Sequence, residues 1–121
     1  ENDTVATEEI KLGDNDRLSA LVSILVRADL LIILSDVEGL LDKNKKVIRL
    51  VKKITSEIKS LACPTRKNTC VGGMITKIQA ARIAVGGGVP CVIANGRRAN
   101  IMSQLTHNPY SKGTIFLPLK K

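Results

Sequence analysis

The sequence has 121 residues, of which 44% are hydrophobic and 25% are charged, and its formal net charge is +8. This length is that of one domain, and the balance of apolar and charged residues excludes a disordered chain. Only Tyr110 and Phe116 are aromatic, so the sequence offers no stacking platform for single-stranded nucleic acid, although its charge favours anionic ligands in general.

Three cysteines, Cys63, Cys70 and Cys91, are odd in number and do not form a C-x-x-C motif. The sequence therefore predicts neither a zinc site nor a disulfide framework, and we expect reduced thiols in a cytoplasmic protein. It contains no signal segment and no apolar run long enough to span a bilayer, so no membrane partner is expected. The chain begins with Glu1 rather than Met, and we expect it to be a fragment.

A polar cluster at residues 14–16 precedes an apolar pattern with helical spacing. Asp14, Asn15 and Asp16 each suit a helix N-cap, and only one of them can occupy that position. The pattern predicts a helix over residues 16–28, with an apolar face that consists of Leu18, Leu21, Val22 and Leu25. Two side chains of the polar cluster are then free to form a site.

Residues 30–34 are continuously apolar, which is typical of a parallel strand covered on both faces. This run ends at Ser35 and Asp36. Polar residues at the carboxyl end of a buried parallel strand face the crevice in which open α/β sheets bind ligands. We therefore expect Ser35 and Asp36 to converge with the polar cluster at one edge of the sheet.

The middle of the chain is less regular. Charge and turn residues predict a surface loop over residues 42–45, and a weak alternation over residues 46–54 predicts a strand. A short helix over residues 56–62, capped by Ser56, is expected next. Residues 63–70 lack periodicity, and we expect them to form a mobile loop.

A glycine pair, Gly72 and Gly73, opens the next predicted helix, which residues 86–88 close. Glycines let the backbone approach a ligand, and the first N–H groups of a helix can hold a phosphate. Lys77 follows one turn later, where an ammonium group could neutralise charge on a moving phosphoryl group. The Walker A motif is absent, and this arrangement taken alone fits a tight turn with a surface lysine better.

The end of the chain predicts a buried strand over residues 89–94, a short helix over residues 99–105 and a last strand over residues 113–117. Strands that alternate with helices predict an α/β fold with a mostly parallel sheet sandwiched by helices. His107 lies in a turn-like segment far from the polar clusters, and no catalytic role is expected for it.

Three motifs in this order resemble the glutamate 5-kinase branch of the amino acid kinase family. They are Gly13-Asp14-Asn15-Asp16-x-Leu18-Ser19-Ala20, Leu31-Ile32-Ile33-Leu34-Ser35-Asp36-Val37-Glu38-Gly39-Leu40 and Gly72-Gly73-Met74-x-Thr76-Lys77. The resemblance covers essentially the whole chain. It implies a three-layer α/β/α fold that is incomplete at the N-terminus, in which residues 1–121 form a single α/β domain, the nucleotide-binding C-terminal portion of a kinase domain.

The resemblance also implies ATP-dependent phosphorylation of the γ-carboxylate of L-glutamate to glutamyl 5-phosphate, the first step of proline biosynthesis, with Mg²⁺ held through the nucleotide phosphates. Asp16 would orient the lysines around the transferred phosphate, and Lys77 would stabilise charge on the moving group. Asp3 and Asn15 would hold glutamate. The nucleotide would contact Ser35, Asp36, Val71, Gly72, Gly73, Met74, Ile75, Thr76 and Lys77.

Family members begin with a segment that carries a further phosphate-binding lysine and glycine-rich loops, and no such segment occurs in this sequence. We therefore expect the 121-residue chain alone to be inactive. Two alternatives stay open: another amino acid kinase, such as an acetylglutamate kinase, and a truncated, non-catalytic basic binding module. An open sheet edge favours pairing, so a homo-oligomer is expected.

Overall fold

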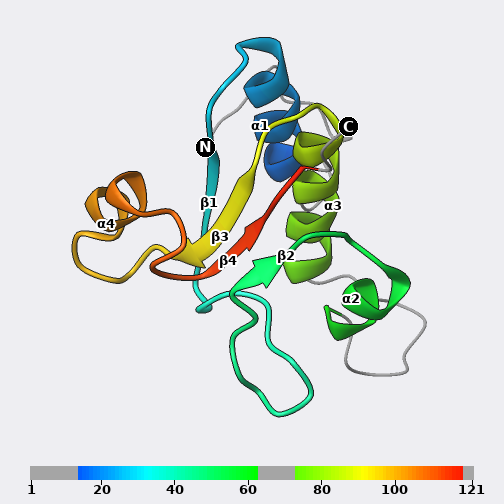
Figure 1. The fold of residues 1–121 in the computed structure, drawn as a ribbon, viewed down its shortest axis with the longest axis vertical. Helices are drawn as coiled ribbons and strands as arrows, with labels where there is room; N and C mark the ends of the chain where they lie inside the picture. The colour runs from blue at the N-terminus through cyan, green and yellow to red at the C-terminus, as the bar shows by residue number, and fades with distance from the viewer. Residues whose placement is uncertain (1–13, 63–72, 119–121) are drawn as a thin grey trace.

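The computed structural model describes residues 14–62 and 73–118. In chain order these residues form α1 (Asp14–Leu25), β1 (Leu31–Ser35), β2 (Leu50–Val51), α2 (Ser56–Leu61), α3 (Gly73–Gly86), β3 (Cys91–Asn95), α4 (Ile101–His107) and β4 (Thr114–Phe116) (Figure 1). The predicted alternation of strands and helices is confirmed. Residues 63–70, expected to form a mobile loop, lie outside the described residues.

The four strands form one open sheet in the order β1-β3-β4-β2. β1 pairs with β3 in parallel, from Leu31 opposite Cys91 to Ser35 opposite Asn95, and β2 pairs with β4 in parallel. β3 and β4 are antiparallel because α4 returns the chain to the end of the sheet at which β3 finishes. A mostly parallel sheet is therefore confirmed, with one antiparallel pairing in its middle.

Helices cover both faces of this sheet. α1 and α3 lie on one face, and α4 lies on the other (Figure 1). Along β3, Cys91 and Ile93 belong to the core beneath α1 and α3, whereas Val92 and Ala94 pack with α4. A strand buried on both faces needs apolar residues at every position, which explains its unbroken apolar run.

The buried face of α1 differs from the predicted face. Ala20 is fully buried and Ser23 nearly so, whereas the predicted apolar residues are 39–81% exposed, namely Leu18, Leu21, Val22 and Leu25. Helices approach each other most closely where their side chains are small. α1 presents its small residues to α3, where Ala80, Ala81 and Ala84 are fully buried, so its larger side chains lie on the outer face.

Two local predictions are also corrected. The N-cap of α2 is Thr55, not Ser56, because the Thr55 hydroxyl accepts a hydrogen bond from the Ile58 N–H at 3.3 Å. The strand expected over residues 46–54 is reduced to the two residues of β2. The charged loop at residues 42–45 is confirmed, and the Asp42 carboxylate accepts from the N–H groups of Asn44 and Lys46.

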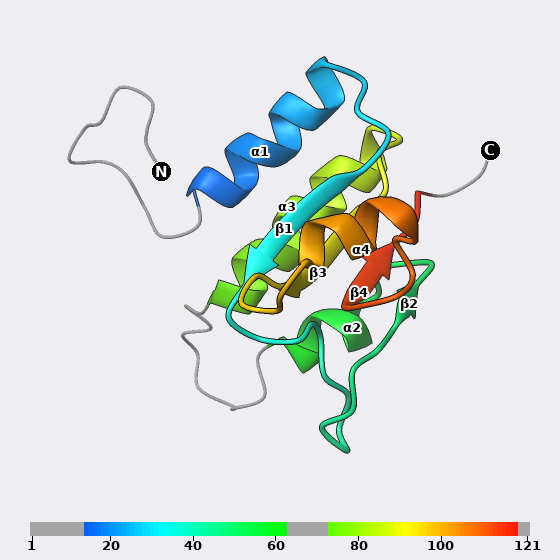
Figure 2. The same ribbon diagram turned by 90° about the vertical axis from the view of Figure 1, so that its left-hand side faces the viewer.

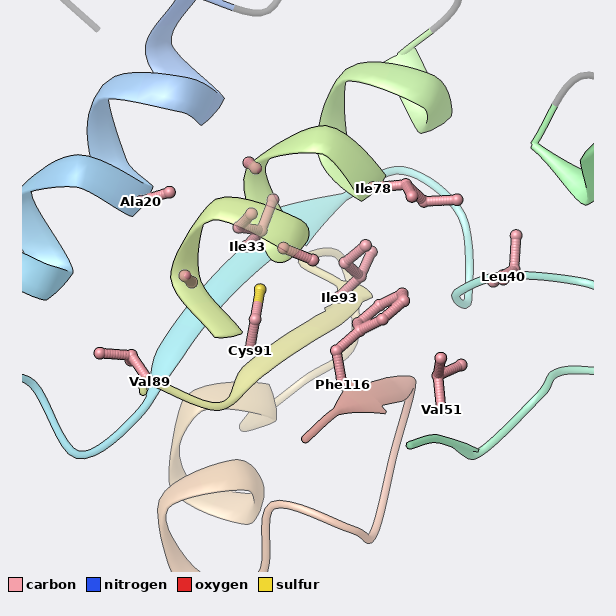
Figure 3. Packing of buried hydrophobic residues seen from close by; sticks show 12 residues of the cluster. Ala20, Ile33, Leu40, Val51, Ile78, Val89, Cys91, Ile93 and Phe116 are labelled. Carbon is pink, nitrogen blue, oxygen red and sulfur yellow. The ribbon is translucent and has the colours of Figure 1, made fainter. Parts of the chain in front are cut away.

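Phe116 is fully buried in the core that joins the sheet to α3. Figure 3 shows its ring beside Ile93 and directed toward Leu40, with Val51 at its flank. Just before β4, the backbone at Gly113 lies so close to β3 that only glycine fits, because a Cβ at this position would lie 2.2 Å from the Ile93 carbonyl oxygen. No helix in residues 14–62 or 73–118 is long and apolar enough to cross a membrane.

Candidate functional site

The first turns of α1 and α3 lie side by side, although they are about 60 residues apart in sequence. Asp16 and Lys77 contact each other at this end, and Ile24 meets Gly87 near the other end, so the two helices run in the same direction. Figure 2 shows the beginning of α3 and the carboxyl end of β1 at one end of the molecule. This is the end at which open α/β sheets bind ligands.

Asp16 organises the contact between the two helices. Its Oδ2 atom accepts a hydrogen bond from Lys77 Nζ at 3.2 Å and another from the Thr76 hydroxyl at 3.2 Å. The side chains of Lys77 and Asp16 are only 16% and 20% exposed. A lysine ammonium has three N–H donors, so it can hold Asp16 and an incoming anion together.

The helix start adds further positive character to this region. The 14-residue helix α3 begins at Gly73, and the positive end of a helix dipole favours an anion there. Met74 and Ile75 are half-buried in this turn. Val71 and Gly72, also predicted to contact the nucleotide, lie outside the described residues.

α1 begins at Asp14, two residues earlier than predicted. Asp16 is therefore inside the first turn rather than at the N-cap, and its carboxylate points to α3. Asn15 is exposed on the same turn. Asp3, the other residue expected to hold glutamate, lies outside the described residues.

Ser35 is the last residue of β1, and Asp36 follows it directly. The Ser35 carbonyl accepts from the Gly96 N–H at 2.8 Å, which fastens this point to the turn after β3, and Asp36 is exposed. Within residues 14–62 and 73–118, no hydrogen bond or ion pair joins Ser35 or Asp36 to Asp16 or Lys77. Those predicted site residues that the structure describes thus form two groups, one where α1 and α3 begin and one after β1.

Sequence reasoning missed a second polar contact at this end. The Glu38 carboxylate accepts from Asn95 Nδ2 at 2.8 Å and from Arg98 Nε at 2.7 Å. The hydrogen bond from Asn95, followed by that from Arg98, lowers the pKa of Glu38 below its ordinary value of 4.5. Its partners are 57 and 60 residues away in sequence, so no local pattern could have revealed them.

Two further features bear on the chemistry. Cys91 is fully buried, and burial, with a smaller contribution from the Asp16 charge, raises the pKa of its thiol to about 12. This thiol is therefore not a nucleophile at neutral pH. In the part of the chain that the structure describes, no three His, Cys, Asp or Glu side chains form a group that could hold a metal ion.

Ile75, one of the residues expected to contact the nucleotide, also borders a small cavity of about 100 Å³. Two cationic side chains belong to its lining, which consists of Lys59, Ile75, Ile78, Gln79 and Arg82. The side of α3 that borders this cavity therefore carries two cationic side chains, Lys59 from α2 and Arg82 from α3.

These features define a three-layer α/β protein with an acid–lysine pair at a helix start suited to anions. The model of the amino acid kinase family matches residues 1–95, and the chain belongs to this family.

Three curated relatives show where in the family the similarity is high. The chain is 46% identical to the glutamate 5-kinase of a Thermoanaerobacter species and 48% identical to that of Caldanaerobacter subterraneus, matching 100% and 99% of this chain and 34% of each relative. It is 44% identical to the glutamate 5-kinase of Clostridium acetobutylicum, of which it covers 47%. The chain thus spans between a third and a half of these relatives' length.

Solved structures agree with this fold. N-acetylglutamate synthase from Neisseria gonorrhoeae, solved with coenzyme A and N-acetyl-glutamate, superposes with a TM-score of 0.71 at 20% identity over 88% of this chain and 24% of its own. Carbamate kinase from Giardia lamblia, bound to AMP-PNP, gives a TM-score of 0.61 at 23% identity over 87% of this chain and 35% of its own. At this identity the likeness concerns the fold alone.

Proposed function

We propose that the chain forms the nucleotide-binding part of a glutamate 5-kinase, with residues 1–121 as a single domain that is the C-terminal portion of the kinase domain. The observation that carries the proposal is the ion pair between Asp16 and Lys77 where two helices begin. The similarity of 44–48% to proteins of that name supports the substrate assignment. The protein would act in the cytoplasm, in the first step of proline biosynthesis.

In the proposed reaction, an oxygen of the γ-carboxylate of L-glutamate attacks the γ-phosphorus of ATP. A new O–P bond forms, the bond to the bridging oxygen of ADP breaks, and glutamyl 5-phosphate results. Such a transfer depends mainly on positioning and on cations, because charge spreads over the oxygens of the moving group. Lys77 would stabilise that charge, and Asp16 would hold the ammonium in place.

The residues present fit a nucleotide. A partly buried ammonium beside the start of a 14-residue helix is a donor set that suits phosphate oxygens. Residues 71–77 would cover the phosphates, and Ser35 and Asp36 would line the nucleotide site. Mg²⁺, which prefers oxygen ligands, would be held through the phosphates themselves. Asp3 and Asn15 would hold glutamate.

Calorimetric titration of the 121-residue chain with Mg-ATP tests the nucleotide site directly. Lys77→Met is expected to weaken ATP binding about tenfold or more, because a charge-assisted contact to phosphate is lost. Lys43→Met is the matched control, since Lys43 is an exposed lysine of the 42–45 loop and its loss changes the net charge equally. Equal affinities of the two variants would contradict the proposed role of Lys77.

Turnover is tested in a chimera, because this chain spans only part of its relatives. The matching segment of the Thermoanaerobacter glutamate 5-kinase is replaced by this chain, and acyl phosphate is trapped with hydroxylamine. We expect product from L-glutamate and not from N-acetylglutamate or aspartate, with loss of product in Lys77→Met. Preference for N-acetylglutamate would favour the acetylglutamate kinase alternative. The isolated 121-residue chain is expected to give no product.

A further inference from the structure

The segment between β1 and Leu40 is fixed at its two ends. At its start the Ser35 carbonyl accepts from the Gly96 N–H at 2.8 Å, and at its finish the buried Leu40 N–H donates to the Thr114 hydroxyl at 2.9 Å. Between these points Asp36 and Val37 are exposed. The side chain of Glu38 ties the middle of this segment to the loop after β3.

Glu38 uses both of its carboxylate oxygens for this purpose. Oε2 accepts from Asn95 Nδ2 at 2.8 Å, and Oε1 accepts from Arg98 Nε at 2.7 Å. The Asn95 amide is itself oriented, because its Oδ1 accepts from the Arg97 N–H at 2.8 Å. One carboxylate therefore connects the loops that follow two adjacent parallel strands, in which Ser35 and Asn95 are paired in register.

The contribution of this contact to global stability is small. The Glu38 and Arg98 side chains are 40% and 45% exposed, and exposed ion pairs are screened by water and salt. Its effect is local instead. With both ends of the segment fixed, a third attachment beside Asp36 restricts the conformations that this exposed carboxylate and its backbone can adopt.

We propose that Glu38 is a positioning residue, which holds the Ser35–Asp36 turn in the shape that receives the nucleotide by bonding Asn95 and Arg98. This inference rests on the proposed function, since it assigns a role within the same site. The proposal predicts that loss of the Glu38 carboxylate weakens ATP binding, whereas electrostatics alone predicts that it strengthens ATP binding. A carboxylate close to a bound nucleotide repels its phosphates, so simple removal of this charge should strengthen ATP binding.

Because the two explanations predict opposite changes in ATP affinity, one substitution distinguishes them. Glu38→Gln keeps the shape of the side chain and removes the ion pair, and we expect it to weaken the binding of Mg-ATP to the 121-residue chain about fivefold. Glu57→Gln, at an exposed glutamate in the first turn of α2, changes the net charge equally and should leave the affinity unchanged or slightly higher. Circular dichroism checks that both variants are folded.

Variants of Arg98, which forms the ion pair with Glu38, provide a further test. Arg98→Lys keeps a cation next to Glu38 and should retain most of the affinity, whereas Arg98→Gln should weaken ATP binding. If the two side chains act as a pair, Glu38→Gln combined with Arg98→Gln should bind ATP no more weakly than the weaker single variant. Additive losses would show that they act separately, which contradicts the proposal.

Amide hydrogen exchange without nucleotide gives a second measurement, independent of ATP. Exchange over residues 36–39 is expected to be about threefold faster or more in Glu38→Gln than in the unaltered chain or in Glu57→Gln. Unchanged exchange overturns the positioning role, and so does faster exchange with unweakened ATP binding. If the unaltered chain shows no saturable ATP binding, the proposed function fails, and the nucleotide role of Glu38 fails with it. Faster exchange in Glu38→Gln would then show only that the contact of Glu38 with Asn95 and Arg98 orders the loop.

Discussion

Lys77 Nζ and Asp16 Oδ2 lie 3.2 Å apart and join two helices near their starts, across 61 positions of sequence. Both side chains are largely shielded from solvent, so neither charge is well hydrated without the other. The pair therefore has a structural role as well as the proposed chemical one. It holds together the ends of α1 and α3 at which the candidate site lies.

A double-mutant cycle measures this structural role. Asp16→Asn and Lys77→Met should each lower the free energy of unfolding by about 1 kcal/mol, because each leaves a partly buried partner without its opposite charge. The double variant should lose less than the sum, with a coupling energy of about 1 kcal/mol. Urea denaturation supplies the values, and strict additivity would show that the contact does not contribute to stability.

Thr114→Val is expected to lower the free energy of unfolding by about 2 kcal/mol. Thr114 is fully buried, and its hydroxyl oxygen accepts from the N–H of Leu40, which valine would leave unsatisfied in the core. Thr106→Val provides the matched comparison, because Thr106 is exposed and its hydroxyl donates only within α4. The prediction fails if both variants unfold at the same urea concentration.

Gly87→Ala should separate the far ends of α1 and α3. The added Cβ would lie 2.5 Å from Cδ1 and Cγ1 of Ile24, and we expect a loss of about 1–2 kcal/mol in unfolding free energy. Introducing Ile24→Ala into this variant should recover part of the loss, since it removes the atoms that clash. The control is Gly86→Ala, where nothing lies within 4 Å of the new Cβ. A Gly86→Ala variant as unstable as Gly87→Ala would point to backbone effects instead.

Alkaline pH should destabilise the fold through Cys91. Its thiol stays protonated in the folded state up to a pKa of about 12, whereas an unfolded thiol ionises near 9.0. The unfolded chain therefore binds fewer protons between these values, and stability that is intact below pH 9 is lost as pH rises toward 12. The expected slope is about 1.4 kcal/mol per pH unit.

The contribution of this thiol is isolated by comparison with Cys91→Ala, which lacks the titrating group. Thermal unfolding of both proteins between pH 8 and pH 11 should show the difference in stability narrowing as pH rises. Parallel curves over this range would mean that the thiol is not protected by burial.

The sequence predicted secondary structure best in segments whose apolar pattern alone determines which residues are buried. The unbroken apolar run before Asn95 predicted a strand covered on both faces, and β3 is that strand. The run before Ser35 also predicted a strand, observed as β1, but its expected burial on both faces was wrong, because β1 lies at the edge of the sheet and Leu34 is 44% exposed. Helical spacing after Gly73 likewise predicted α3 with nearly correct bounds. In β3 and α3 local composition and tertiary environment agree.

The errors arose where a contact depends on a distant partner. On α1 the largest apolar residues were assigned to the core, but Ala20 and Ser23 are buried because α3 offers a matching row of small residues. Asp16 and Lys77 could be named from motifs, although their contact follows from the parallel packing of the two helices. The attachment of Glu38 to Arg98 has no local signal at all.

The outward face of α1 has a consequence for how copies of this protein behave in solution. Its leucines and Val22 form an apolar stripe on a molecule that carries a formal net charge of +8. At low ionic strength mutual repulsion keeps such molecules apart, but at 1 M salt the screening length shrinks to about 3 Å. Raising the salt concentration removes that repulsion and leaves the apolar attraction, so this protein should be more monodisperse in dilute buffer than in concentrated salt.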